Sequence, residues 1–196
     1  MNDKQWKIEK YLPQLSGNIL FVGVGKDPEG VKHYSEYHKL IKTPESFETL
    51  DMMTEGVIST KASKHHMCDF LEFNNEHQYD HISLHGLWGE RFIFRKEDRN
   101  LSSGKLTNII INSINKAHNM LNVGGTLEIG PSTNTVNVIY DYLVEEELYE
   151  SKYRINRNEE GSGNCIFWGK KLNNNPFNYE NHDLWETIKT VGLFQH

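Results

Sequence analysis

Glycines and a proline follow the first apolar run of this chain in an order that could hold a nucleotide. The segment Asn18–Val24 is apolar along most of its length, and its end overlaps the sequence Gly23-Val24-Gly25. Glycines let a backbone turn tightly and approach a ligand without a Cβ clash. Asp27-Pro28 then carries the signals of a helix start, an N-cap aspartate and a proline at the first helical position. A strand, a glycine turn and a helix N-terminus in this order form a nucleotide-type pocket.

Two aspartates and a histidine stand at the ends of later apolar runs. Asp51 comes about 26 residues after Gly25, close to the ~20 at which a ribose-binding acid follows such a turn. Its carboxylate can accept hydrogen bonds from both ribose hydroxyls. His85 offers an imidazole that can take a proton from a hydroxyl near neutral pH. Structural alternatives stay open: Asp51 as a helix cap, Asp69 as a turn residue, and His85 as a hydrogen-bond partner of a ligand or the backbone.

Strand-like and helix-like segments alternate along the chain, which predicts an α/β fold with a mostly parallel sheet. The carboxyl ends of parallel strands meet at one edge, where ligands bind. The expected strands are 18–24, 46–50, 65–68, 79–85 and 126–129, followed by an antiparallel pair at 153–156 and 165–170. The expected helices are 3–12, 28–41, 55–63, 106–121 with a stop at Gly124-Gly125, one within 135–151, and 181–193.

Composition limits the class of protein. With 196 residues, 37% hydrophobic, the chain is long enough for one globular domain. The net charge of −6 argues against broad binding to nucleic acid. The basic residues between Arg91 and Arg99 could grip a phosphorylated acceptor or RNA, although a solvated loop is favoured. No apolar run reaches about 18 residues, so no membrane span is expected. Without a secretory signal or a disulfide framework, we expect a cytoplasmic protein.

The order of elements over about residues 15–171 resembles the class I S-adenosylmethionine-dependent methyltransferases. Gly23 and Gly25 match the first two glycines of that family's first motif. Phe21 stands where the family usually has an acid, and Asp27 stands where it has a third glycine. The segment Leu121–Leu127, with its Gly-Gly pair, matches the turn that precedes the family's fifth strand.

The resemblance implies a Rossmann-like three-layer sandwich whose seven-stranded sheet ends in an antiparallel hairpin. It also implies a single domain, 1–196, with S-adenosyl-L-methionine as cofactor and a small-molecule acceptor, either a sugar or metabolite hydroxyl or a nitrogen. In that reading Asp51 binds the ribose, Met52 packs on the adenine, and Asp69 accepts from the adenine amino group. The implied cofactor-binding residues are Gly23, Val24, Gly25, Asp51, Met52, Asp69, Phe70 and His85, and His85 is also the catalytic base.

Other functions fit parts of the same pattern. Phe21 and Asp27 favour a methyltransferase-like partner subunit without turnover. An aminopropyl transferase, which uses the decarboxylated cofactor, would fit the absence of the first-motif acid at Phe21. No acidic polyamine-binding pattern supports that function. A nicotinamide-dependent oxidoreductase could use the glycines and Asp51, but the third glycine is missing. No metal is expected, because His81 and His85 lie about 13 Å apart on a strand at ~3.3 Å per residue. The oligomeric state stays open.

Overall fold

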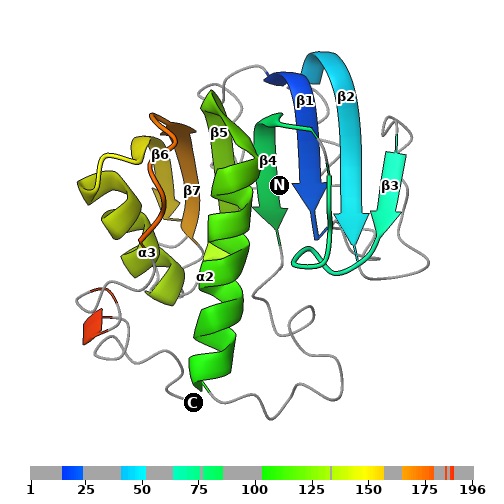
Figure 1. The fold of residues 1–196 in the computed structure, drawn as a ribbon. Helices are drawn as coiled ribbons and strands as arrows, with labels where there is room; N and C mark the ends of the chain where they lie inside the picture. Colours follow the sequence, from blue (N-terminus) through cyan, green and yellow to red (C-terminus); the bar gives the residue numbers. More distant parts are fainter. Residues whose placement is uncertain are drawn as a thin grey trace, which may run out of the picture.

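The computed structural model describes residues 15–23, 41–51, 64–75, 77–85, 103–132, 134–156 and 165–178, together with 184, 186 and 187 (Figure 1). The helices expected at 3–12 and 55–63, and nearly all of those expected at 28–41 and 181–193, lie outside these residues. Residue 41, expected to end a helix, is the first residue of a strand. None of the helices in the described part of the chain is long and apolar enough to cross a membrane.

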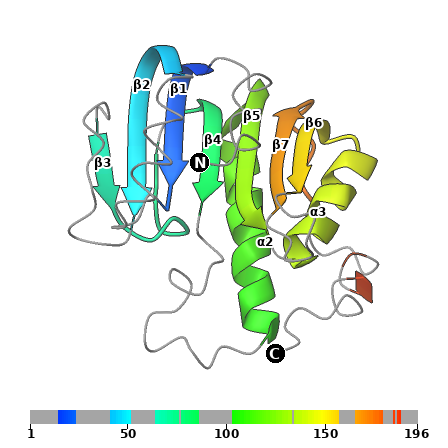
Figure 2. The same ribbon diagram turned by 180° about the vertical axis from the view of Figure 1, so that it is seen from behind.

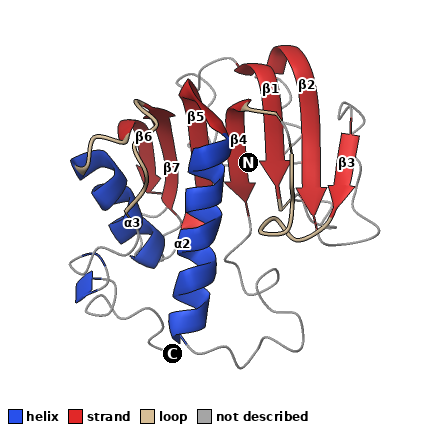
Figure 3. Cartoon of the chain, in the orientation of Figure 1, coloured by secondary structure: helices blue, strands red, loops and turns tan. Residues whose placement is uncertain are grey.

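Seven strands form one sheet in the order β3-β2-β1-β4-β5-β7-β6. The strands β1 to β5 pair in parallel, while β7 runs antiparallel to both β5 and β6. This arrangement, drawn in red in Figure 3, confirms the predicted sheet and its closing hairpin. The strands are β1 (Leu15–Val22), β2 (Ile41–Asp51), β3 (Lys64–Met67), β4 (Tyr79–His85), β5 (Leu121–Ser132), β6 (Tyr149–Asn156) and β7 (Cys165–Lys171).

Two helices, α2 (Ser103–Met120) and α3 (Asn134–Glu145), pack on one face of the sheet, as Figures 1 and 2 show from opposite sides. The apolar stripe of α2 drives this contact, since isoleucines spaced three and four residues apart face the strands. Tyr140 of α3 stacks on Phe167 of β7 with ring centroids 4.1 Å apart. The buried core of this face includes Leu20, Val22, Leu50, Ile82, Leu84, Ile110, Ile111, Ile114, Ala117, Leu127, Ile129, Ile139 and Leu143.

The opposite face of the sheet is buried too, but it is more polar. Side chains alternate between the two faces along a strand, and strand pairing aligns five of them across five neighbouring strands. Phe21 pairs with Thr49 and Ser83, Ser83 pairs with Glu128, and Glu128 pairs with Trp168. None of the five is more than 1% exposed. We call this set, Thr49, Phe21, Ser83, Glu128 and Trp168, the central row.

Lys171, the last residue of β7, caps the carboxyl end of α2. The expected stop at Gly124-Gly125 is wrong: α2 ends at Met120, and both glycines lie within β5. The last carbonyls of a helix have no partner inside the helix. The Lys171 ammonium, 2% exposed, donates to the carbonyl oxygens of His118 at 2.6 Å and Leu121 at 2.8 Å. A buried cation at this end also complements the helix dipole.

The two glycines instead let β5 bulge against β4. The pairing of the two strands shifts register between Tyr79 and His81. Gly124 has φ +86°, and a Cβ on Gly125 would come within 2.9 Å of the Asn122 carbonyl oxygen. The glycine pair therefore permits the close approach of two backbones at this irregularity.

Buried His118 predicts a stability that depends on pH. Burial first, and then the Lys171 ammonium, lower the pKa of His118 from 6.5 to about 4. Its neutral ring donates through Nε2 to the Asn175 carbonyl at 2.9 Å and accepts through Nδ1 from the Tyr149 hydroxyl at 3.1 Å. As the pH falls from 7 to 5, His118 binds a proton in the unfolded chain but stays neutral in the folded protein. We expect this residue to remove about 1–2 kcal/mol of unfolding free energy over that range.

Urea unfolding at both pH values measures this effect. A His118→Gln variant should lose this part of the pH dependence, whereas a His77→Gln variant, in which an exposed histidine changes, should keep it. An unaltered pH dependence in His118→Gln would contradict the assignment.

Candidate functional site

The chain leaves β1 at Gly23, in a backbone conformation that favours glycine. Gly23 has φ +77°, a conformation that residues with a Cβ rarely adopt. Its N–H donates to the Leu50 carbonyl of β2 at 2.8 Å. The turn is thereby tied to the neighbouring strand at the carboxyl edge of the sheet. Val24 and Gly25, which were predicted to complete the turn, lie outside the described residues.

Strand register brings three predicted site residues to one level. Val22 pairs with Leu50 on β2 and with Leu84 on β4, so the next residue of each strand also lies side by side. Those residues are Asp51, Gly23 and His85. At about 4.8 Å per strand, the Asp51 and His85 Cα atoms are about 10 Å apart, with Gly23 between them.

Asp51 is the last residue of β2, and it is only 3% exposed. Alternation along β2 places its side chain on the polar face, together with Thr49. His85 ends β4 and pairs with Gly130 of β5; its side chain lies outside the described part of the chain. The carboxyl edge of β2, β1 and β4 therefore offers a buried carboxylate, a glycine turn and the backbone position of an imidazole.

Asp69 and Phe70 hold the loop after β3. The Asp69 carboxylate accepts from the Leu71 N–H at 2.8 Å, and its carbonyl accepts from the N–H groups of Glu72 and Phe73. Asp69 thus stabilises a turn, which is the structural role that the sequence left open for it. Phe70 is 3% exposed within the core, and the Lys116 ammonium lies 5.6 Å from its ring centre. Their contact with a cofactor stays a prediction, as does that of Met52, which lies outside the described residues.

Phe21 fills the position at which the resemblance expects an acid. Its ring is fully buried. It meets Phe47 edge to face at 5.2 Å between ring centres, and it meets His81 in the same manner at 5.8 Å. A carboxylate at this position would lie between two aromatic rings with no room for water. The departure from the family pattern is therefore built into the packing of the polar face.

Sequence reasoning missed the polar groups that surround Phe21. His81 Nδ1 and Thr126 Oγ1 are hydrogen-bonded at 2.7 Å, and His81 Nε2 lies 3.8 Å from a carboxylate oxygen of Glu128. Ser83 Oγ and Trp168 Nε1 are buried and have no hydrogen-bond partner among the described residues. The signal was present, because polar and apolar residues alternate through 81–84 and 126–129. That alternation fits a sheet face that carries polar groups.

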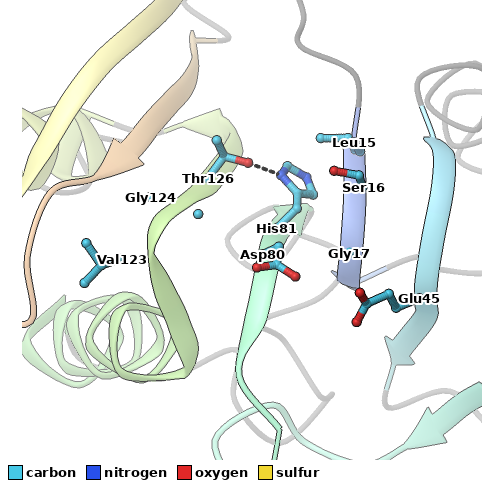
Figure 4. Close-up of a pocket in the computed structure, with 10 residues that line it drawn as sticks. Leu15, Ser16, Gly17, Glu45, Asp80, His81, Val123, Gly124 and Thr126 are labelled. Atoms are coloured by element: carbon cyan, nitrogen blue, oxygen red, sulfur yellow. Dashed lines mark hydrogen bonds between the residues drawn. The ribbon is translucent and has the colours of Figure 1, made fainter.

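A cavity of about 600 Å³ opens at the opposite, amino edge of the sheet (Figure 4). It is lined by residues that include Ser16, Glu45, Asp80 and Thr126. Both carboxylate oxygens of Asp80 are already engaged, one by the Asn18 N–H and one by the Asn122 amide, each at 2.9 Å. This carboxylate ties β1 to β4 and to the start of β5, so we assign it a structural role.

No group of three or more His, Cys, Asp and Glu side chains in the described ranges is placed to hold a metal ion.

The comparisons with known proteins rest on shape alone. No protein-family model and no curated protein matches the chain. Among solved structures, the N-methyltransferase NodS from Bradyrhizobium japonicum WM9 superposes with a TM-score of 0.54 at 14% identity, covering 88% of this chain and 100% of that one. SMU.1697c from Streptococcus mutans, a methyltransferase candidate in complex with S-adenosylhomocysteine, gives 0.53 at 9% identity, with 88% and 99% covered. An rRNA methylase from Streptococcus thermophilus gives 0.52 at 9% identity, with 84% and 91% covered.

This chain has the fold of the class I S-adenosylmethionine-dependent methyltransferases. Its methyltransferase fold was predicted from the motifs and the order of elements, and the superpositions confirm it. At 9–14% identity the likeness extends to the fold alone, so the function has to be argued from the chain's own residues.

The packing of Phe21 predicts that restoring the usual acid destroys the fold instead of improving a site. Phe21→Asp should lower the unfolding free energy by about 4 kcal/mol or more, because it leaves a cavity and an unpaired buried charge. Phe21→Leu keeps an apolar side chain and should cost about 1 kcal/mol. Urea unfolding of both variants tests this, and a Phe21→Asp protein as stable as the parent would show that the position is open to water.

Proposed function

We propose that this protein transfers the methyl group of S-adenosylmethionine to a small polar acceptor, either a sugar or metabolite hydroxyl or a nitrogen. The observation that carries the proposal is the alignment of Gly23, Asp51 and His85 across three adjacent parallel strands of a methyltransferase fold. Ligands of open α/β sheets bind at this carboxyl edge. The proposal joins that alignment to the chemistry of each residue.

The residues at this edge fit the adenosine part of the cofactor. The left-handed backbone at Gly23 turns the chain without a side chain, so no Cβ blocks a ligand at this position. Asp51 supplies a carboxylate beside that turn. Two ribose hydroxyls can both donate to one carboxylate, and a buried location strengthens such bonds. In this proposal Val24 and Gly25 continue the turn, Met52 packs on the adenine, and Asp69 and Phe70 bound the adenine on the side of β3.

The chain's contribution to catalysis is placement and proton removal. S-adenosylmethionine, when bound, supplies an electrophilic methyl group on a sulfonium. The protein then has to hold an acceptor in line with that methyl group and take its proton. We assign the proton to His85, whose backbone lies beside the Gly23 turn, because an imidazole is neutral and basic near pH 7.

The size of the acceptor is inferred from the chain between β4 and α2. Residues 86–102 form the whole connection, which offers little room for a dedicated recognition domain. Solved structures of this fold include an rRNA methylase and a ribosomal protein L11 methylase, so the fold itself does not select an acceptor. The net charge of −6 disfavours a nucleic acid and supports a small molecule. Two cysteines in the whole chain favour a cytoplasmic location.

A second function is favoured by one observation. Phe21 replaces a charged group of the family motif with a buried aromatic ring, which suits a domain that binds a partner or the cofactor without turnover. The two functions differ in a single measurement, because only the enzyme transfers a labelled methyl group to an acceptor.

Loss of the Asp51 carboxylate should weaken binding of the adenosine moiety. Asp51→Ala should raise the Kd for S-adenosylhomocysteine in calorimetry about ten- to a hundredfold, because hydrogen bonds to a charged group are lost. Glu45→Ala, at the opposite end of the same strand and exposed, is the matched control and should bind as the parent does. Unchanged affinity in a folded Asp51→Ala protein would defeat the pocket assignment.

Replacement of His85 separates a base from a simple contact. His85→Ala should lower kcat by about 10²–10⁴, because the proton acceptor is gone. The assay follows labelled methyl transfer to the acceptor identified from a panel of sugars and metabolites. A His77→Ala variant, altered at an exposed histidine, is the control. A variant with full kcat and only a weaker cofactor Kd would assign His85 to cofactor contact.

A further inference from the structure

A second cavity lies between α2 and the chain that joins β3 to β4. It holds about 580 Å³, which falls within the ~300–1,000 Å³ of small-molecule pockets. None of the described residues that line it is acidic, in a chain whose net charge is −6. Its lining instead gathers side-chain amides, and we call the cavity the amide groove after these residues: Asn75, Gln78, Asn112, Asn115 and Asn119.

The amides come from two separate parts of the chain. Asn112, Asn115 and Asn119 belong to α2, and their spacing of three and four residues places them on one side of the helix. At 1.5 Å of rise per residue, they extend over about 10 Å of the groove. Asn75 and Gln78 precede β4 and line the same cavity. A ligand in the groove therefore meets amides from both parts.

Hydrogen bonds hold the groove in shape before any ligand arrives. Gln78 Nε2 donates to the Asn119 carbonyl at 3.3 Å, and Asn119 Nδ2 donates to Asn115 Oδ1 at 3.5 Å. The Lys116 ammonium donates to the Leu71 carbonyl at 2.8 Å, which ties α2 to the chain after β3. An amide has two N–H donors and an oxygen with two lone pairs, so one internal bond leaves it able to bind a ligand.

The charges around the groove favour a neutral ligand. Asn119 is in the last turn of α2, where the helix dipole is negative and disfavours an anion. The Lys116 ammonium is engaged by the Leu71 carbonyl and lies 5.6 Å from the centre of the Phe70 ring. A cationic ligand would need a carboxylate, and the described lining has none.

We propose that the amide groove binds a neutral saccharide of about disaccharide size. Sugar hydroxyls both donate and accept hydrogen bonds, as side-chain amides do, so a row of amides can match successive hydroxyls. A row about 10 Å long suits a ligand of that size. Most small-molecule pockets are lined by apolar and aromatic side chains. The described lining has no Phe, Tyr or Trp, so a nucleobase finds no such ring to stack on.

The amide groove is separate from the proposed cofactor site. Met120, which also lines the groove, precedes Leu121, and Leu121 pairs with Tyr79 at the start of β4. His85 is the last residue of the same strand, about 20 Å away at ~3.3 Å per residue. A sugar in the groove is thus too far from His85 to accept a methyl group there. The groove is a second site, and this inference does not depend on the proposed function.

Titration of the protein with neutral disaccharides tests the inference. The probes are maltose, cellobiose, lactose and N,N′-diacetylchitobiose, with binding followed by saturation-transfer NMR. At least one should bind the parent protein. The double variant Asn112→Ala/Asn115→Ala should raise its Kd about ten- to thirtyfold, because hydrogen bonds from two amides are lost. Alanine is a better helix former than asparagine, so the variant should fold. Asn108→Ala, exposed and one turn earlier on α2, is the matched control and should keep the parent Kd.

The contrary results are equally specific. Failure of all four disaccharides to bind, or a Kd that the double variant leaves unchanged, would overturn the proposal. Binding of glucose 6-phosphate in the groove without binding of any neutral sugar would overturn the choice of a neutral ligand. S-adenosylhomocysteine should bind the double variant as it binds the parent, and a weakened Kd would contradict the separation of the two sites. A parent protein that binds a disaccharide but no S-adenosylhomocysteine would defeat the proposed function and leave this inference standing.

Discussion

The pairing of β1 with β2 on one side and β4 on the other fixes the candidate site. The Gly23 N–H and the Leu50 carbonyl, 2.8 Å apart, close this pairing at the carboxyl edge. A shift of one residue in a strand moves every side chain to the other face of the sheet. Such a shift in β2 would turn Asp51 into the apolar core, and a shift in β1 would move the glycine turn away from it. The parallel register is therefore the condition for any shared ligand.

The two faces of the sheet divide the work of folding and of binding. The face under α2 and α3 is mostly apolar, and its isoleucines and leucines supply the hydrophobic free energy that holds the sheet together. The other face buries His81, Ser83, Thr49 and Glu128, groups that reduce stability unless they are hydrogen-bonded. The presence of these buried polar groups below the carboxyl edge, where Gly23 and Asp51 lie, is consistent with a polar ligand on that side of the sheet.

Local patterns predicted the elements whose signals are local. Alternation placed β4 at Tyr79–His85, its observed bounds, and helical spacing found α2 to within a few residues. The misses depend on distant contacts. Gly124-Gly125 suggested a helix stop, but Lys171, some fifty residues away, caps the helix. The strand expected at 46–50 is longer in the structure, where β2 begins at Ile41 and includes Pro44. Strand β3 pairs with β2 only from Glu48 onward, so the missing N–H of Pro44 costs no bond between those two strands. Of the site, Gly23 and Asp51 were visible as motif residues, while the central row depends on register across five strands.

A crystal structure of the protein with S-adenosylhomocysteine tests the central claim most directly. We expect both ribose hydroxyls within hydrogen-bond distance of the Asp51 carboxylate, with the sulfur above the turn that begins at Gly23. Adenosine density at any other edge of the sheet, or side chains filling the space between Gly23 and Asp51 in the soaked crystal, would contradict it.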